Sequence, residues 1–298
     1  DYLRDFSTPT PLAYDRPPQG LADQNDDAAD HCVHLSPDLT ARLTTLAQQH
    51  RVTPNTFVQG AWAILLAYYS GERDVLFGVT VAGRPTQLLG VESVLGLFIN
   101  TLPLRVSVSP EQPVLAWLKD LLAENIRLRE YEYTPLIQIQ RCSEIPRGEA
   151  LFHSLFVFEN APVDPALCEG RIMFRAEEEQ YRVHTNYPMT VMGWPSKELG
   201  LKLSYDRRLF DSETVLRMIG HLKRILEGLI MCPDARIGDL PLLDHEERAA
   251  LLAHGTGQTE GPRDDRSFAT RFEAQVRRNP QAVAVTCDDR SLTYEALN

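Results

Sequence analysis

The sequence predicts an α/β fold in which a mixed sheet is flanked by helices. Helix starts are marked at Ser36 and Thr53, each a capping residue followed by proline and then by apolar residues at helical spacing. Apolar runs of strand length follow at 75–81 and 155–158, and leucines alternate with other residues over 199–205. Because helical and strand patterns are mixed along the chain, they are expected to pack as layers around a substantial sheet.

The first part of the chain changes from loop to helix. Residues 15–31 are rich in Pro, Gly and Asp and are predicted to form a mobile loop. The helix that starts at Pro37 is expected to bury Leu39, Leu43 and Leu46. The next helix, from Pro54, is expected to stop at Ser70-Gly71.

Two strands and a helix are predicted next. The run 75–81 ends at Ala82-Gly83-Arg84-Pro85, and a second strand is expected within 97–101. Pro103 cannot donate to a ladder, so it predicts a bulge or a sheet edge. A long helix from Pro113 is expected to face inward with Leu115, Leu118, Leu122 and Ile126.

The remaining strands and a final helix complete the predicted sheet layer. Strands are expected at 155–158 and 189–192. The alternation over 199–205 predicts a strand with one face that is wet or free of helices. Asp211 is expected to cap a helix whose apolar seam is Val215, Met218, Leu222, Ile225 and Leu229.

The pattern changes near Asp244. Residues 244–265 are charged and contain Gly, which predicts a linker. A helix with Phe268, Phe272 and Val276 on one face then precedes a strand at 282–286 and a turn at 288–289. Roughly 30 residues cannot bury a core of their own, so this end is expected to be a truncated second domain.

Composition narrows the function classes. The net charge of -11 makes nucleic acid an unfavourable partner, and no apolar run approaches the roughly 18 residues of a membrane helix. The chain opens with charged residues and without Met, so its start is expected to be cut or processed. Five scattered cysteines favour reduced thiols in a cytoplasmic protein. They are Cys32, Cys142, Cys168, Cys232 and Cys287.

Several segments resemble a known family. Gly78–Pro85 (GVTVAGRP) and Gly96–Arg105 (GLFINTLPLR) are similar to the later core motifs of nonribosomal peptide synthetase condensation domains. Further matches follow in the same order at 133–140, 151–160, 186–190, 205–211 and 240–243. The resemblance covers residues 1–243 and identifies them as the C-terminal part of a condensation domain. After the linker, 266–298 resembles the truncated N-terminus of an adenylation domain, with Leu292–Leu297 (LTYEAL) as its first core motif.

The resemblance implies a fold and a reaction. Condensation domains resemble chloramphenicol acetyltransferase, with two α/β lobes around a tunnel. Donor and acceptor carrier proteins bring substrates as thioesters on 4′-phosphopantetheine, and the acceptor amine attacks the donor thioester to form an amide. The implied partners are an N-terminal condensation lobe, the two carrier proteins and the adjoining adenylation domain. No cofactor is expected to bind this chain directly, and ATP is expected only for a complete adenylation domain.

The family's catalytic motif, His-His-x-x-x-Asp-Gly, has no match here. The eight histidines are isolated from one another, and none is followed by Asp-Gly at the required offset. A placed histidine typically contributes about 10²–10⁴-fold to a proton transfer. The chain is therefore expected to be the second lobe, to contain no catalytic residue and to catalyse nothing alone.

Five residues are candidates for the tunnel or the interface between lobes. The resemblance makes Arg84 a partner of the motif's Asp; the alternative is an exposed loop arginine. Ala82 stands where some relatives carry a serine that faces the reaction centre. Asn100 is expected to make either a structural hydrogen bond or a substrate contact. Asn186 and Tyr187 are candidates to line the tunnel.

The remaining histidines and motifs give no further candidate for catalysis or metal binding. His184 is expected to be structural or on the surface. His31, Cys32 and His34 match no usual zinc spacing, so no metal site is expected. The sequence also lacks a glycine-rich phosphate loop and a nucleophile elbow.

Three alternatives remain open. An epimerisation domain shares the fold, although an adenylation domain behind it argues against this alternative. An ester-forming relative would use the same architecture. A third alternative is a module that docks carrier proteins and the adenylation domain, which is the only role expected to persist in the isolated chain.

Overall fold

The structure, a computed structural model, describes residues 2–16, 27–84, 90–146, 148–159, 185–255, 267–287 and 290–298. Residue contacts divide the chain into two compact units, Asp1–Leu243 and Asp244–Asn298. No helix in the described ranges combines the length and hydrophobicity that crossing a bilayer requires. The first unit contains the candidate site residues.

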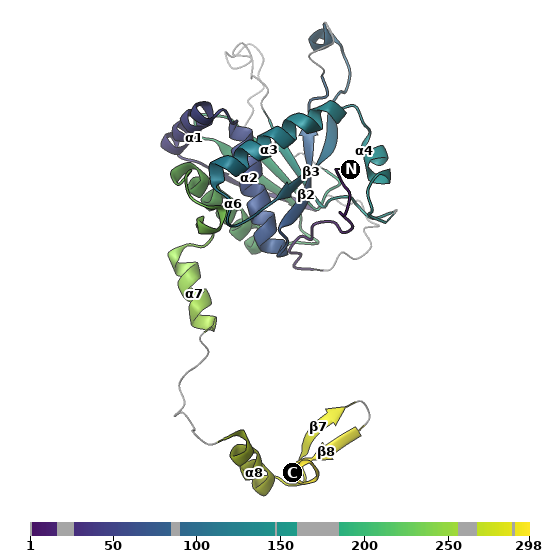
Figure 1. Ribbon diagram of the computed structural model, residues 1–298, viewed down its shortest axis with the longest axis vertical. Helices are drawn as coiled ribbons and strands as arrows, with labels where there is room; N and C mark the ends of the chain where they lie inside the picture. Colours follow the sequence, from purple (N-terminus) through teal and green to yellow (C-terminus); the bar gives the residue numbers. More distant parts are fainter. Residues whose placement is uncertain are drawn as a thin grey trace. The chain divides into compact units, whose positions relative to one another are not determined.

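A six-stranded sheet forms the centre of the first unit, in the order β1-β6-β5-β4-β2-β3 (Figure 1). The β2–β4 and β4–β5 pairs are parallel, whereas β1–β6, β5–β6 and β2–β3 are antiparallel. The predicted mixed sheet is therefore confirmed. Its strands are β1 (Ala28–His34), β2 (Asp74–Val81), β3 (Asn100–Ser107), β4 (Ser154–Phe158), β5 (Met189–Trp194) and β6 (Gly200–Asp206).

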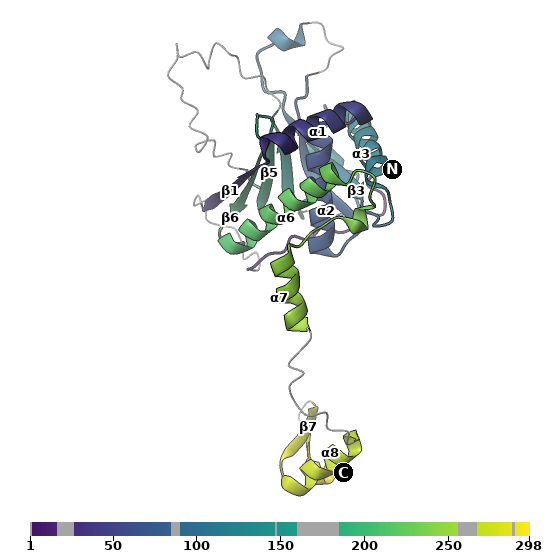
Figure 2. The same cartoon turned by 90° about the vertical axis from the view of Figure 1, so that its left-hand side faces the viewer.

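Four helices cover one face of this sheet. They are α1 (Pro37–His50), α2 (Pro54–Ser70), α3 (Val114–Leu128) and α6 (Ser212–Met231) (Figures 1 and 2). Alternate strand residues such as Phe77, Val191 and Leu203 are fully or almost fully buried against them, with Trp62 and Leu222 from the helices. This layer is the main core. Short elements of the same unit are α4 (Leu136–Arg141), η1 (Val91–Ser93), η2 (Arg129–Tyr131) and η3 (Ile237–Asp239).

Local signals set the ends of α1 and α2 as predicted. The Ser36 hydroxyl accepts from the Leu39 amide at 3.3 Å, and the Thr53 hydroxyl accepts from the Thr56 amide at 3.1 Å. Gly71 ends α2 in the left-handed region, with φ 75°. These side chains satisfy backbone groups that a helix end leaves unpaired.

The start of α6 differs from the prediction. The side chain of Asp211 makes no capping hydrogen bond and instead pairs with Arg16. The Asp15 carboxylate accepts from the Asp211 amide at 2.8 Å and from the Thr214 hydroxyl at 2.9 Å. A residue from the N-terminal segment thus holds the start of α6, through the Asp211 amide and the Thr214 hydroxyl.

The buried face of α3 is rotated from the predicted one. Ile126 was expected to face inward, but it is 58% exposed. Each step of four residues turns about 40° around a helix, so the series from Leu118 to Ile126 drifts out of the core. Leu118 is buried as predicted, and the other buried positions are Val114, Trp117, Leu121 and Leu128.

The other face of the sheet is also covered. Leu3 and Phe6, from the N-terminal segment, pack there with Leu76 and Phe152. On β6 one face was expected to be wet or free of helices. Lys202 and Ser204 are only 8% and 6% exposed, so their face is not wet. The four helices, however, pack on the opposite face, that of Leu201 and Leu203. Alternation separated the two faces of this strand correctly but did not show that both are covered.

Two strands begin at unexpected places. β1 was missed, and its first residues, 28–31, fell within the predicted loop. β3 begins at Asn100, whereas Leu97, expected in the strand, is 88% exposed. Pro103 does lie on an edge strand, as predicted.

The second unit contains short elements. The helix α8 (Phe268–Arg278) and the strand β7 (Val283–Cys287) confirm the predicted elements. The predicted linker contains a helix, α7 (His245–Gly255). The expected turn at 288–289 lies outside the described residues. The unit also contains β8 (Arg290–Thr293) and α9 (Tyr294–Leu297).

Candidate functional site at one end of the sheet

Three of the predicted site residues meet where β2 ends and β3 begins. Val81, the last residue of β2, pairs with Asn100, the first of β3. Ala82 follows directly and is exposed, and Arg84 is half-buried. The helix η1 lies beyond this end of the sheet in both views (Figures 1 and 2).

Arg84 holds the returning part of this loop. Its Nη1 donates to the carbonyl oxygens of Val91, at 2.6 Å, and Val94, at 3.1 Å. Its guanidinium carbon lies 4.5 Å from the centre of the Phe98 ring. The two bonds use both Nη1 hydrogens, while Nε and Nη2 have no acceptor among the described residues. Arg84 is thus bonded on one side and leaves a fork of donors on the other.

Gly83 permits a close backbone contact in this loop. Its φ is 61°, and an added Cβ would lie 1.9 Å from the Phe98 carbonyl oxygen. Only glycine fits here without strain, because other residues pay sterically for positive φ and would also overlap this oxygen. Sequence reasoning placed Gly83 at the strand end but did not identify Phe98 as its neighbour.

Asn100 is committed to structural hydrogen bonds. Its Nδ2 donates to the carbonyl oxygens of Glu132 and Thr134, both at 2.9 Å. Its Oδ1 accepts from the Thr101 amide at 2.8 Å. Both amide hydrogens are therefore used, and Asn100 ties the start of β3 to the segment after α3.

Asn186 and Tyr187 lie toward the opposite end of the strands. Leu155 pairs with both Gly78 and Thr190, so Tyr187 is level with Val75. Six strand residues, or about 20 Å, separate that level from Val81. Tyr187 stacks on Phe152 with ring centres 5.2 Å apart, and burial raises its pKa. Asn186 is exposed.

The five candidates therefore do not converge on one pocket in the described part of the chain. His184 lies outside the described residues. The loop end instead presents apolar side chains to solvent, with Leu95, Leu97 and Ile99 at 98%, 88% and 64% exposure. Such exposed apolar groups are typical of interaction surfaces when they gather.

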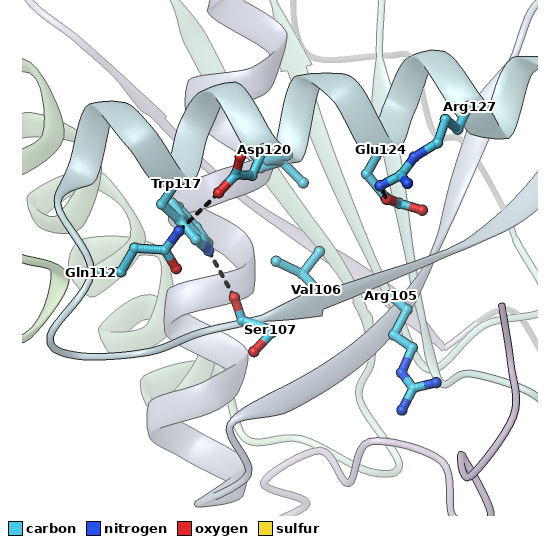
Figure 3. A pocket seen from close by; sticks show the side chains of 9 residues that line it. Arg105, Val106, Ser107, Gln112, Trp117, Asp120, Glu124 and Arg127 are labelled. Carbon is cyan, nitrogen blue, oxygen red and sulfur yellow. Dashed lines mark hydrogen bonds and ion pairs between the residues drawn. The ribbon is translucent and has the colours of Figure 1, made fainter.

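A separate hollow of about 180 Å³ lies between β3 and α3 (Figure 3). The Trp117 indole donates to the Ser107 carbonyl oxygen at 2.7 Å, and Gln112 donates to Asp120 at 2.9 Å. None of the candidate residues lines this hollow. Its lining is Arg105, Val106, Ser107, Gln112, Trp117, Asp120, Leu121, Glu124 and Arg127.

The His31–His34 region is used for packing. His31 bonds to the Ser212 hydroxyl at 2.9 Å and stacks on Tyr205 at 5.7 Å. The His34 ring lies edge-on to Trp194 at 5.8 Å. Within the described ranges, no group of three or more His, Cys, Asp or Glu residues could hold a metal ion.

Comparison with known sequences gives a family match over most of the chain. The family profile described as "Condensation domain" matches residues 2–252. One of the proteins of linear gramicidin synthase from Brevibacillus parabrevis is 38% identical over 298 residues, which are 100% of this chain and 4% of that protein. Chondramide synthase cmdD of Chondromyces crocatus is 37% identical over 321 residues, covering 99% of this chain and 8% of its own. The chain thus spans a small part of these relatives.

Solved structures share the fold. Holo-AB3403, a four-domain nonribosomal peptide synthetase bound to AMP and glycine, matches 98% of this chain and 23% of its own, with TM-score 0.70 and 16% identity. The first condensation domain of the calcium-dependent antibiotic synthetase, in complex with a substrate analogue, matches 73% of this chain and 47% of its own, with TM-score 0.59 and 16% identity. The predicted fold class is confirmed.

Proposed function

We propose, from the premise that this chain belongs to the condensation-domain family of nonribosomal peptide synthetases, that it forms one lobe of a cytoplasmic amide-forming enzyme. The opposite lobe would carry the His-His-x-x-x-Asp-Gly motif. In support, the chain covers only 47% of a solved condensation domain, and its own histidines are isolated. Residues 266–298 would begin an adenylation domain.

The proposed reaction joins two carrier-bound substrates. The acceptor amine attacks the carbonyl carbon of the donor thioester, a C–N bond forms, and the C–S bond breaks. The amine loses a proton and the leaving thiolate takes one, so the step balances without an added reactant. Both substrates would be held on 4′-phosphopantetheine of the carrier proteins, and this chain would supply one wall of the tunnel that positions them.

Arg84 is the observation on which the lobe assignment rests. Its Nη1 is fixed by two carbonyl oxygens and its ring contact to Phe98 limits rotation. The edge formed by Nε and Nη2, which has no acceptor among the described residues, has the geometry that binds a carboxylate through two parallel hydrogen bonds. The Asp of the opposite lobe's motif is the proposed acceptor.

The lobe assignment predicts that the isolated chain forms no amide. Loaded donor and acceptor carrier proteins should give no product with this chain alone, because the proton-transfer group and the second tunnel wall are missing. The same assay with the chain joined to its N-terminal lobe should give product, detected by mass spectrometry. Turnover by the isolated chain would contradict the proposal.

The pairing of Arg84 can be tested by a double-mutant cycle in the complete protein. Arg84→Ala and a change of the motif's Asp to Ala should each lower the condensation rate, and the double variant should lose little more than either single one. Groups that act as a pair are non-additive by about 0.5–3 kcal/mol. Fully additive losses would mean that Arg84 acts only by holding its own loop.

A docking role is the second candidate function. The exposed Leu95 and Leu97 flank the same end of the sheet as Asn100, which binds the segment that carries exposed Tyr131 and Tyr133. We expect these side chains to contact the opposite lobe or the carrier proteins. An ester-forming variant of the reaction would use the same geometry and would be detected by supplying a hydroxyl acceptor.

A further inference from the structure

The two edge strands of the sheet differ in whether the backbone groups that point away from the sheet have hydrogen-bond partners. In an antiparallel pair, residues alternate between facing the partner strand and facing away from it. An edge strand therefore exposes every second residue's N–H and C=O, and these groups are a template for another strand. β1 and β3 are the two edge strands here.

The β3 edge is closed by side chains. The amide of Val108 donates to the carbonyl oxygen of Arg73 on the β2 side. Two-residue alternation then turns the backbone N–H and C=O groups of Arg105 and Ser107 away from β2, toward the outer edge. The Arg105 amide donates to the Tyr2 hydroxyl at 2.7 Å, and Ser107 O accepts from the Trp117 indole (Figure 3). Pro103 also faces the outer edge and, being a proline, has no N–H to donate. Strand addition at β3 would require these contacts to break.

In the part of the chain that the structure describes, nothing pairs with the outer edge of β1. The amide of Leu35 donates to the carbonyl oxygen of Leu199, and the amide of Arg207 donates to the carbonyl oxygen of Asp27. The odd-numbered residues of β1 therefore direct their backbone groups toward β6. The outward residues are Ala28, Asp30, Cys32 and His34. Their backbone N–H and C=O groups have no hydrogen-bond partner among the described residues. Figure 2 shows β1 as the outermost strand, beside β6.

We infer that β1 is a docking edge that accepts an extended segment of a partner protein as a seventh strand. Four outward residues would supply alternating donors and acceptors over the length of the strand. The contrast with β3 in the same sheet supports this assignment. The β3 edge is blocked at each outward position from Pro103 to Ser107, whereas no described residue blocks the β1 edge.

The surroundings of β1 define the chemistry of the partner strand. On the helix side, Ser212 of α6 bonds to His31, and Leu216 lies one turn further on the same face of α6 with 57% exposure. An added strand would meet this leucine with apolar side chains. On the other side, the Asp30 carboxylate is already paired with the Lys202 ammonium at 3.8 Å, so it adds little attraction of its own. The chain's net charge of -11 is what favours basic side chains on the partner. The occupant is therefore a strand that alternates apolar and basic residues.

A proline substitution tests the backbone contact with little change to the fold. The Cys32 N–H faces outward, so Cys32→Pro removes an edge donor and leaves the β1–β6 ladder intact, as Pro103 does on β3. A fluorescent peptide of alternating lysine and valine should bind the full chain, and Cys32→Pro should weaken its affinity about tenfold. Cys32→Ala keeps the N–H and should bind like the unchanged chain. Fluorescence anisotropy measures each affinity.

A second probe keeps the test valid if Cys32→Pro unfolds. The same peptide with alternate amides N-methylated can no longer pair along one edge, and it should bind the unchanged chain about tenfold more weakly. Equal binding of the plain and methylated peptides would show attraction by charge alone and overturn the inference. Concentration-dependent dimers in light scattering that Cys32→Pro abolishes would overturn it too, because a second copy would then occupy the edge.

Discussion

Replacing Asn100 by Asp is expected to lower the free energy of unfolding by about 3 kcal/mol and to abolish amide formation by the complete protein. The substitution keeps the size of the side chain but removes both hydrogens that Nδ2 gives to Glu132 and Thr134. A carboxylate oxygen would then face two carbonyl oxygens, so the segment after α3 should separate from the start of β3. Chemical denaturation measures the stability, and a condensation assay measures the activity.

Asn125 provides a matched control within the same unit. Its Nδ2 also donates two bonds of 2.9 Å, to the Gln59 side chain and to the Leu121 carbonyl oxygen. Asn125→Asp should therefore destabilise the fold by a similar amount. Because Asn125 lies inside the helix layer, the residual activity of its folded fraction should be normal. Equal loss of activity in both variants would show that Asn100 matters only for stability.

The second large effect is expected at Gly83. Gly83→Ala should cost about 3 kcal/mol, since a positive φ adds about 1–2 kcal/mol for an alanine and overlap with the Phe98 carbonyl oxygen adds about as much again. The loop must also move, which should displace the Phe98 ring from Arg84 and lower the condensation rate. Denaturation of the chain and turnover of the complete protein measure the two effects.

Gly71→Ala separates the cost of a positive φ from the cost of overlap with a neighbouring atom. Gly71 has a comparable φ of 75°, but an added Cβ would meet no atom within 4 Å. Its alanine variant should lose only about 1 kcal/mol and keep full activity. If the two glycine variants were equally stable, the close approach of Phe98 to Gly83 would have no energetic importance.

Sequence patterns predicted the elements whose signals are local. Ser36, Thr53 and Gly71 mark helix ends with side chains or conformations that act within four residues, and the structure has each of them. β1 was missed because it becomes a strand by pairing with β6, far along the chain. The contacts of Asp15 with the start of α6 have the same origin, since its partners follow about two hundred residues later.

The candidate residues came from motif resemblance and their role stays a prediction, whereas their contacts came only from the structure. Motif resemblance identified Arg84 and Asn100, and the structure places both at one end of the sheet. Nothing in the sequence pattern indicates that Arg84 binds Val91 and Val94, because these partners are carbonyl oxygens that any residue could supply. The separation of Tyr187 from Arg84 follows from strand register, which a one-dimensional pattern does not contain.

The pairing of β1 with β6 also bears on how the protein is made. A ribosome that adds about 5–20 residues per second needs on the order of ten to thirty seconds to pass from His34 to Gly200, where the partner strand begins. During that interval the nascent β1 has neither of its edges paired within this sheet. Synthesis of this chain therefore includes a period in which β1 is exposed to mispairing with other strands.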